Sequence, residues 1–161
     1  MTVQPTILVR PMTVEDISAV VEIEKESFVT PWTPHAFRLE MRNHLAVYRV
    51  VEVDGRVAAY GGMWLILDEG HVTNIAVHPE FRGRHLGRKI MEVLMDEARQ
   101  RKLLRMTLEV RKQNHVAIAL YKDLGFLLAG IRPGYYQDTG EDALIMWIEL
   151  NNDRGEMTKE K

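Results

Sequence analysis

The chain has 161 residues, of which 46% are hydrophobic and 27% are charged, and its formal net charge at pH 7 is −2. This length and composition suit one compact globular domain, whereas the nearly neutral charge argues against a general nucleic-acid binder, which is usually markedly basic. The chain contains no cysteine, which excludes disulfides, thiolate nucleophiles and cysteine metal sites.

The start of the chain and its longest apolar run argue against export and against a membrane span. Residues 1–10 lack the apolar core of a signal peptide. The longest apolar run, at residues 58–67, is far shorter than the roughly 20 residues that a membrane-spanning helix needs. We therefore expect a cytoplasmic protein that has no membrane partner.

Hydrophobic periodicity predicts a strand at residues 7–10 and two helices after it. In the first helix the apolar residues recur at helical spacing, at Ile17, Val20, Val21 and Phe28. The second helix begins at Thr33-Pro34, where threonine can cap the helix and proline suits its first turn.

The middle of the chain predicts three strands and a third helix. Strands are expected at residues 46–53 and 56–66, joined by Asp54-Gly55, a strong signal for a two-residue hairpin. A strand at residues 70–77 leads into a basic loop, and an amphipathic helix follows that loop. The expected buried stripe of this helix is Leu86, Ile90, Val93, Leu94 and Ala98.

The last part of the chain predicts one helix between strands. These elements are expected at residues 104–110 (strand), 114–124 (helix), 126–131 (strand) and 143–150 (strand). A hairpin rich in Gly, Pro and Asp lies at residues 133–141. The full order, β-α-α-β-β-β-α-β-α-β-β, predicts a mixed α/β (α+β) protein with a mixed sheet covered by helices. We expect one domain over residues 1–150 and a polar, disordered tail over residues 151–161.

The basic loop at residues 82–89 opens the third helix and contains Gly83 and Gly87. The first N–H groups of a helix have no partner within it, and the helix dipole adds positive potential there, so phosphate binds well at this point. The cationic residues of the loop are Arg82, Arg84, Arg88 and Lys89. The alternative interpretation is an ordinary strand-to-helix turn with a solvated basic patch. The chain lacks a P-loop and a G-x-G-x-x-G motif, which argues against ATP hydrolysis and NAD chemistry.

Glu109, Asn114 and Tyr121 are polar residues at the end of a strand and on the helix that follows it. Asn114 and Tyr121 are about two helical turns apart and share one helix face, so all three residues can face one cleft. Each has a simpler alternative, namely a solvated carboxylate, a helix cap and a core tyrosine. In the following hairpin, Tyr135 and Tyr136 can form a substrate wall or simply pack the hairpin.

The sequence gives little support for a serine nucleophile or for a metal site built on histidine. Ser18 and Ser27 are the only serines, and neither lies in a G-x-S-x-G turn. None of the six histidines belongs to an H-E-x-x-H motif. We therefore expect no metal.

Taken together, these segments resemble the GNAT acetyltransferase superfamily over about residues 7–150. The family hallmark is Arg/Gln-x-x-Gly-x-Gly/Ala after a strand, and Arg82-Gly83-Arg84-His85-Leu86-Gly87 occupies that position. His85 stands where the family usually has glycine. The resemblance implies the GNAT fold, a central, mixed and mostly antiparallel sheet of about seven strands flanked by about four helices.

Within the superfamily the chain is most similar to bacterial enzymes that acetylate the N-terminal alanine of a ribosomal protein. Four segments carry this closer likeness: Pro31-Trp32-Thr33, residues 74–77, residues 108–126 and Arg132-x-x-Tyr135-Tyr136. The run from residue 108 to 126 is the most specific, with Leu-Glu-Val-Arg followed by Asn-x-x-Ala-x-x-Leu-Tyr-x-x-Leu-Gly-Phe.

The resemblance implies a role for each site residue. Acetyl-coenzyme A would be held by Ile75, Ala76, Val77, Gly83, Arg84, His85, Leu86, Gly87, Arg88 and Asn114. Glu109 would be the general base and Tyr121 the general acid, while Trp32, Tyr135 and Tyr136 would contact the substrate. The acetyl group would pass directly to the amine in a ternary complex, which agrees with the missing cysteine.

Two other functions stay open at this stage. One is acetylation of a lysine side chain or a small amine, and the other is a catalytically silent coenzyme A-binding module. A groove that accepts a basic peptide would be acidic, and the candidates for its lining are Asp68, Glu69, Glu141 and Asp142. The alternative for each of them is a solvated turn residue.

Overall fold

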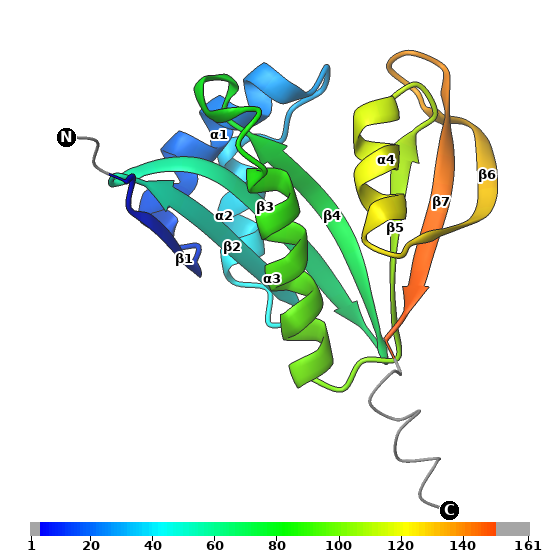
Figure 1. The fold of residues 1–161 in the computed structure, drawn as a ribbon. Coiled ribbons are helices and arrows are strands. Elements are labelled where there is room, and N and C mark those ends of the chain that lie inside the picture. The colour runs from blue at the N-terminus through cyan, green and yellow to red at the C-terminus, as the bar shows by residue number, and fades with distance from the viewer. Residues whose placement is uncertain (1–3, 151–161) are drawn as a thin grey trace, which may run out of the picture. The chain divides into compact units, whose positions relative to one another are not determined.

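The computed structural model describes residues 4–150 and contains seven strands and four α-helices (Figure 1). The strands are β1 (Ile7–Pro11), β2 (Ala46–Val53), β3 (Arg56–Ile66), β4 (Glu69–Val77), β5 (Arg105–Arg111), β6 (Leu127–Tyr136) and β7 (Glu141–Glu149). The helices are α1 (Ile17–Ser27), α2 (Pro34–Met41), α3 (Leu86–Gln100) and α4 (His115–Asp123), with short 3₁₀ turns η1 (Val14–Asp16) and η2 (Pro79–Phe81). The predicted tail at residues 151–161 lies outside the described residues.

The strands are hydrogen-bonded in the order β1-β2-β3-β4-β5-β7-β6. β4 and β5 pair in parallel, whereas β1 with β2, β2 with β3, β5 with β7 and β6 with β7 pair antiparallel. The predicted element order and the mixed, mostly antiparallel sheet are confirmed.

The contacts of the chain group it into two compact units. The first holds residues 4–64 and 73–94, and the second holds residues 65–72 and 95–150. The expectation of a single domain stays a prediction.

The hairpin predicted at Asp54-Gly55 is present between β2 and β3. Both residues have positive φ angles, +51° and +83°, as the type I′ turn requires. The side-chain carboxylate of Asp54 also accepts the backbone N–H of Thr6, with an N···O distance of 2.9 Å. This turn sets the register in which β2 and β3 pair.

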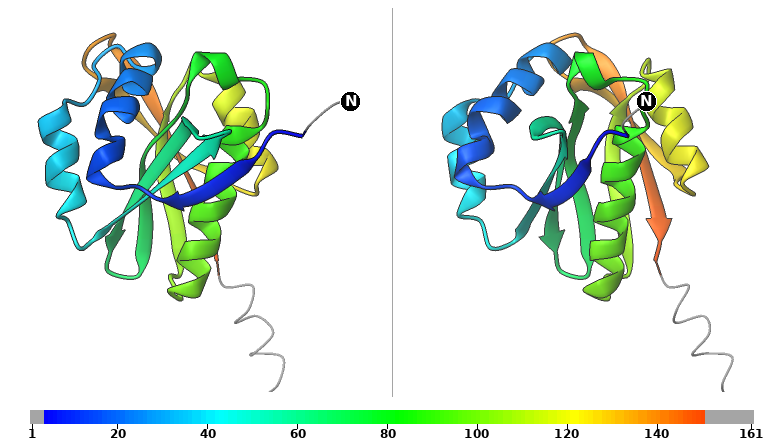
Figure 2. Two further views of the ribbon diagram at one scale, coloured as in Figure 1. Left: turned by 90° about the vertical axis from the view of Figure 1, so that its left-hand side faces the viewer. Right: turned by 60° about the vertical axis from the view of Figure 1, so that its left-hand side comes forward.

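In the first unit, α1 and α2 cover one face of β3 and α3 covers the other (Figure 2). Tyr60 faces α1 and α2, since its ring lies 5.9 Å from that of Phe37 and its hydroxyl donates to Glu24. Gly61, the next residue, faces α3, because a Cβ atom placed there would lie 2.3 Å from Cγ2 of Ile90. Helix α3, which begins at the basic loop, therefore packs directly on the backbone of β3.

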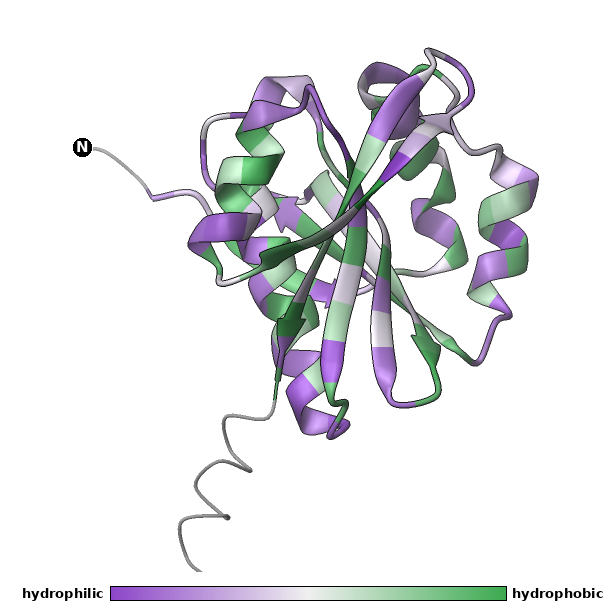
Figure 3. Cartoon of the chain, turned by 90° about the vertical axis from the view of Figure 1, so that its right-hand side faces the viewer, coloured by the Kyte–Doolittle hydropathy of each residue, from purple (hydrophilic) through white to green (hydrophobic). Residues whose placement is uncertain are grey.

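Helix α3 is amphipathic as predicted, and the helices in Figure 3 carry both hydrophilic and hydrophobic residues along their length. The buried stripe differs from the prediction in one respect. Val93 is only half-buried, while Met91 and Met95 are buried. The stripe is thus wider than the narrow one predicted, because two methionines are buried in addition to Ile90 and Leu94.

We expect Gly61→Ala to destabilise the protein by about 1–3 kcal/mol, because the new methyl group would overlap Ile90 in a closely packed layer. Gly130→Ala is a matched control, since its Cβ would meet only Ile145, at an ordinary 3.9 Å. Urea unfolding of both variants measures the difference. Equal effects at the two positions would contradict the close approach of α3.

The second unit corrects the predicted hairpin at residues 133–141. β6 continues to Tyr136, and the turn that joins it to β7 lies within residues 137–140. The pairing of β6 with β7 is irregular between Arg132 and Tyr136, where Gly134 has a φ of +63°. Because β6 is the last strand of the sheet, Pro133 and Gly134 fit a bulge on an edge strand, although together they are also typical of a turn.

Candidate active site

The end of β4 holds the residues predicted to bind the pantetheine arm. Its pairing with β5 covers Glu69 to His71, and Ile75, Ala76 and Val77 lie further along the strand. Ala76 is buried, whereas Ile75 and Val77 are half-buried. β4 therefore presents a stretch of extended backbone, whose amides and carbonyls can bond to an amide-containing chain such as pantetheine.

The loop after β4 forms a cradle suited to pyrophosphate. Gly83 has a φ of +81°, and a Cβ placed there would meet no atom within 4 Å. The backbone N–H of Lys89 donates to the carbonyl of His85 at 3.1 Å, so α3 begins at Leu86. By helix geometry the N–H groups of residues 86–88 then have no partner within the helix. These donors and the open space at Gly83 fit a diphosphate.

Arg82 and Arg84, two cationic side chains of the loop, differ in their contacts. Arg82 bonds to other parts of the protein: its Nε donates to the carbonyl of Val77 at 3.1 Å, and its Nη2 lies 3.4 Å from the hydroxyl of Ser27. Arg84 is exposed and its guanidinium lies 5.1 Å from the ring centre of Phe81. Arg82 thus fixes the strand end, while Arg84 adds positive charge at the loop surface.

His85 occupies the position of the usual family glycine and has a φ of +63°. This left-handed conformation costs most residues about 1–2 kcal/mol, whereas glycine adopts it freely. His85 therefore has the backbone conformation that is typical of glycine. Its exposed imidazole projects from the start of α3.

We expect His85→Gly to change the free energy of unfolding by less than about 1 kcal/mol, since relief of the left-handed strain is offset by the flexibility of glycine in the unfolded chain. The affinity for acetyl-coenzyme A, measured calorimetrically, should change less than about threefold, because the helix amides carry the pyrophosphate. A larger loss would contradict this and would make the side chain of His85 part of the cradle.

The second unit contains both predicted catalytic residues. Glu109 is half-buried in β5, opposite Ile145 of β7, while its neighbours Leu108 and Val110 are buried. Tyr121 lies half-buried on α4, with its ring 6.0 Å from that of Phe126. Burial raises the pKa of Tyr121 to about 12, so its hydroxyl keeps its proton throughout the neutral range.

Asn114 is the N-cap of α4. Its side-chain oxygen accepts the backbone N–H of Ala117 at 3.2 Å, and its own carbonyl accepts that of Ile118 at 3.0 Å. The alternative interpretation of Asn114 as a helix cap is therefore correct for its side-chain oxygen. The side-chain amino group takes no part in this cap, and its predicted contact with the cofactor stays a prediction.

Tyr136, at the end of β6, is half-buried and interacts with charged groups of the same unit. Burial raises its pKa to about 12, the guanidinium of Arg111 opposes the rise, and the negative charge of Glu109 adds to it. The rings of Tyr135 and Tyr136 meet edge to face, with their centres 5.0 Å apart. The tyrosine pair of β6 thus belongs to the same unit as both proposed catalytic groups, and Tyr136 lies close enough to Glu109 for the two to interact electrostatically.

Arg111 fixes the turn between β6 and β7. Its guanidinium donates to Asp138 at 2.8 Å and to Thr139 and Glu141, each at 3.0 Å, and it lies 4.1 Å from the ring centre of Tyr136. The side chain of Arg111 is 23% exposed, so these charge-assisted bonds are partly shielded from water. Arg111 belongs to the Leu-Glu-Val-Arg motif at residues 108–111, but nothing in the sequence indicates this role.

Trp32 lies in the first unit, in the connection between α1 and α2. Its ring centre is 5.3 Å from that of Phe37, and its backbone N–H donates to Glu24 at 2.9 Å. Trp32 is half-buried, so part of its surface is available for contact with a substrate.

The acidic groove expected from the sequence is largely neutralised by internal ion pairs. Glu69 bonds to Arg105 and His71, each at 3.0 Å, and both partners lower the pKa of its carboxyl, His71 first. Glu141 pairs with Arg111, as described above. Asp142 lies 4.0 Å from Lys112 and accepts the backbone N–H of Gly134. Three of the four candidates are therefore structural ion-pair or turn residues.

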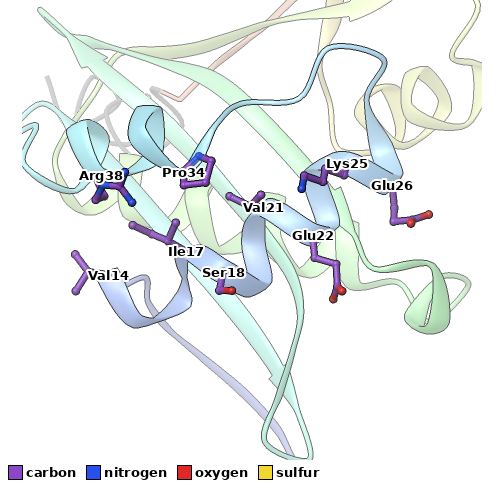
Figure 4. Close-up of a pocket in the computed structure, with 9 residues that line it drawn as sticks. All are labelled: Val14, Ile17, Ser18, Val21, Glu22, Lys25, Glu26, Pro34 and Arg38. Carbon is purple, nitrogen blue, oxygen red and sulfur yellow. The ribbon is translucent and has the colours of Figure 1, made fainter.

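A separate hollow of about 770 Å³ lies on the first unit beside η1, α1 and α2 (Figure 4). It is lined by Val14, Ile17, Ser18, Val21, Glu22, Lys25, Glu26, Pro34 and Arg38. None of the predicted cofactor, catalytic or substrate residues lines it, so this hollow is not the candidate site.

Two classes of feature are missing from residues 4–150. No group of three or more His, Asp or Glu side chains there could hold a metal ion. No helix in the same range is long and apolar enough to cross a membrane.

The chain matches the acetyltransferase (GNAT) family over residues 17–126. That stretch includes β4, the cradle at the start of α3, Glu109 and Tyr121. The chain therefore belongs to the GNAT acetyltransferase family, and the predicted family membership and fold are confirmed.

More specific relatives share most of the chain. It is 46% identical over 144 residues to a Bacillus subtilis (strain 168) protein whose name gives ribosomal protein bS18-alanine N-acetyltransferase as a provisional description, covering 89% of this chain and 95% of the relative. The crystal structure of the ribosomal-protein-S18-alanine N-acetyltransferase from Escherichia coli is similar with a TM-score of 0.84 and 34% identity, covering 90% and 94% of the two chains. A Salmonella typhimurium protein, provisionally described as an acetyltransferase and solved with acetyl-coenzyme A, is similar with a TM-score of 0.78 and 25% identity, covering 91% and 95% of the two chains.

Proposed function

We propose that this protein transfers the acetyl group of acetyl-coenzyme A to the N-terminal α-amino group of a protein, with alanine-starting ribosomal protein bS18 as the first candidate substrate. The observation that carries the proposal is the similarity, over about nine tenths of the chain, to enzymes named for this reaction. A ribosomal protein substrate also supports a cytoplasmic location.

The cradle at the start of α3 is the proposed site for the pyrophosphate of the co-substrate. Gly83 leaves space for the close approach of a ligand, and the amides of Leu86, Gly87 and Arg88 supply donors. The backbone of Ile75 to Val77 is proposed to bond to the pantetheine arm. When bound, acetyl-coenzyme A supplies the acetyl group as a thioester, which an amine can attack.

Glu109 is the proposed general base. An α-amino group has a pKa near 8, so a substantial fraction is protonated at neutral pH, and a carboxylate can accept its proton directly or through a water molecule. The amine nitrogen then forms a bond to the acetyl carbon while the carbon–sulfur bond breaks. Because the amine itself attacks the acetyl carbon, no covalent enzyme intermediate is needed. Coenzyme A leaves as a thiolate, which can take up the second proton that the nitrogen loses.

Tyr121 is proposed to stabilise the leaving sulfur mainly as a hydrogen-bond donor. The pKa of its hydroxyl, about 12, is far above the value near 8.5 that is ordinary for a thiol. Complete proton transfer from Tyr121 to a thiolate is therefore unfavourable in free energy. A hydrogen bond to the developing negative charge is favourable, and it leaves the proton on Tyr121. This refines the acid role that the family resemblance implies.

The pKa of Tyr121 predicts the pH profile of the wild-type enzyme. The value of kcat/KM should rise as the substrate amine loses its proton near pH 8 and should not fall again up to pH 10. Tyr121 must be protonated to donate, and a pKa raised to about 12 extends its protonated range above that limit. A descending limb centred near pH 10, the ordinary value for tyrosine, would contradict this assignment.

Lysine or small-amine acetylation is the main competing activity. The test uses three forms of one alanine-starting peptide that contains lysine: unblocked, blocked at lysine, and blocked at the N-terminus. We expect the lysine-blocked peptide to be acetylated at the rate of the free one and the N-blocked peptide to be inert. Acetylation of only the N-blocked and free forms would favour the lysine activity, and binding of acetyl-coenzyme A without turnover of any amine would favour a silent module.

A further inference from the structure

Glu24 is a carboxylic acid in the core of the first unit. It lies on α1 with only 1% of its surface exposed. Its position continues the apolar stripe that the sequence predicts at Ile17, Val20, Val21 and Phe28, where a charged residue is unexpected. A fully buried carboxylate costs several kcal/mol unless it is hydrogen-bonded, so its presence calls for a specific set of partners.

The partners of Glu24 come from separate parts of the first unit. One carboxylate oxygen accepts the backbone N–H of Trp32, in the connection between α1 and α2, at 2.9 Å. The other accepts the hydroxyl of Tyr60 on β3. The amide of Asn74 on β4 bonds to the same hydroxyl at 3.3 Å and also to Glu24. Glu24 therefore joins the connection, β3 and β4 at a single point.

The donors partly offset the effect of burial on the carboxyl group. Burial raises the pKa of Glu24, while the hydrogen bonds from Tyr60, Trp32 and Asn74 act in the opposite direction. Stability alone does not explain this arrangement. A protein in which apolar residues of similar volume replace a buried polar cluster is often as stable as the original. A cluster of this kind is better explained by the geometry that it imposes on its neighbours.

Two of these neighbours belong to the proposed binding residues. Trp32 is a proposed substrate contact, and its backbone is held by Glu24. Asn74 directly precedes Ile75, the first residue proposed to bind pantetheine, and its side chain also accepts the hydroxyl of Thr73 at 2.7 Å. The same carboxylate thus fixes the substrate-contact segment relative to the cofactor strand.

We propose that Glu24 is a positioning residue for the amine substrate, because its buried carboxylate holds the Trp32 connection against β3 and β4. This inference rests on the proposed function. It assigns no chemical step to Glu24, whose two carboxylate oxygens already accept hydrogen bonds from Trp32 and Tyr60 in the core. Loss of the carboxylate should misplace Trp32 and weaken peptide binding, while the cradle at the start of α3 stays intact.

The test compares Glu24→Gln with Glu26→Gln, a matched change of an exposed carboxylate on the same helix. In Glu24→Gln one oxygen becomes a donor, so either the N–H of Trp32 or the hydroxyl of Tyr60 loses its acceptor. We expect KM for an alanine-starting peptide to rise roughly tenfold, as the loss of a hydrogen bond to a charged group would cause. The Kd of acetyl-coenzyme A and kcat should change less than about twofold, and Glu26→Gln should match the wild type.

Tyr60→Phe provides a second, independent variant that keeps the ring and removes only the hydroxyl. It should raise KM in the same direction, and the double variant should be no worse than Glu24→Gln alone, since both act through one bond. If Glu24→Gln does not fold, Tyr60→Phe decides the question.

A wild-type enzyme that acetylates no N-terminal peptide would overturn the proposed function and this inference together. An active wild type with unchanged KM in the folded variants would overturn the inference alone. So would a fall in stability without any change in KM, because that is the result expected of a purely structural carboxylate.

Discussion

Glu109→Gln should lower kcat about 10²–10⁴-fold at neutral pH, the range that general acid–base catalysis contributes. The amide has nearly the shape of the carboxylate but cannot accept a proton from the attacking amine. The Kd of acetyl-coenzyme A should change less than about twofold, because the proposed cradle and pantetheine strand do not include Glu109. Steady-state kinetics with an alanine-starting peptide and calorimetric titration with acetyl-coenzyme A measure the two quantities.

The loss in Glu109→Gln should shrink as the pH rises above 8, where more of the amine is already neutral. Glu26→Gln, which removes an exposed carboxylate from α1, controls for the change in net charge and should behave like the wild type. Turnover of Glu109→Gln equal to that of the control would eliminate Glu109 as the base.

Tyr121→Phe should lower kcat about 10–100-fold, because the hydroxyl bonds to developing charge and such a bond contributes about 1.5–3 kcal/mol. The ring and its packing against Phe126 are kept, so the fold and the affinity for acetyl-coenzyme A should be preserved. Single-turnover kinetics with a preformed complex separates this chemical step from binding.

Tyr136→Phe is the matched control for this experiment. Burial raises the pKa of both tyrosines to about 12, but Tyr136 is a proposed substrate contact, and its loss should raise KM for the peptide with little change in kcat. If Tyr121→Phe instead weakened binding and left the single-turnover rate intact, Tyr121 would be a binding residue.

Local signals in the sequence were sufficient for much of the fold. Asp54-Gly55 predicted its hairpin because a type I′ turn needs positive φ at both residues, and the structure has that geometry. The start of α3 was predictable because glycine, basic residues and an apolar stripe adjoin there. His85 was recognisable in the sequence as a departure from the family glycine, but its left-handed backbone was not predicted and comes from the structure.

The differences arise where a residue's neighbours are far away in the chain. Pro133 and Gly134 have the composition of a turn, and only the place of β6 at the sheet edge allows them in a strand. Glu24 bonds to Tyr60, 36 residues away, and Arg111 bonds to Asp138, 27 residues away. Periodicity could have drawn attention to Glu24 as a charge on an apolar stripe, but it contains no information on the partners that satisfy the carboxylate.

The most direct test of the central claim is tandem mass spectrometry of ribosomal protein bS18 after incubation with this enzyme and acetyl-coenzyme A. The bS18 should begin with a free N-terminal alanine and keep all its lysines unblocked, so that both kinds of amine compete. We predict a single acetyl group on the α-amino group of the N-terminal alanine, and none when Glu109→Gln replaces the wild type for the same short incubation. Acetyl groups on lysine side chains with an unmodified N-terminus would contradict the account.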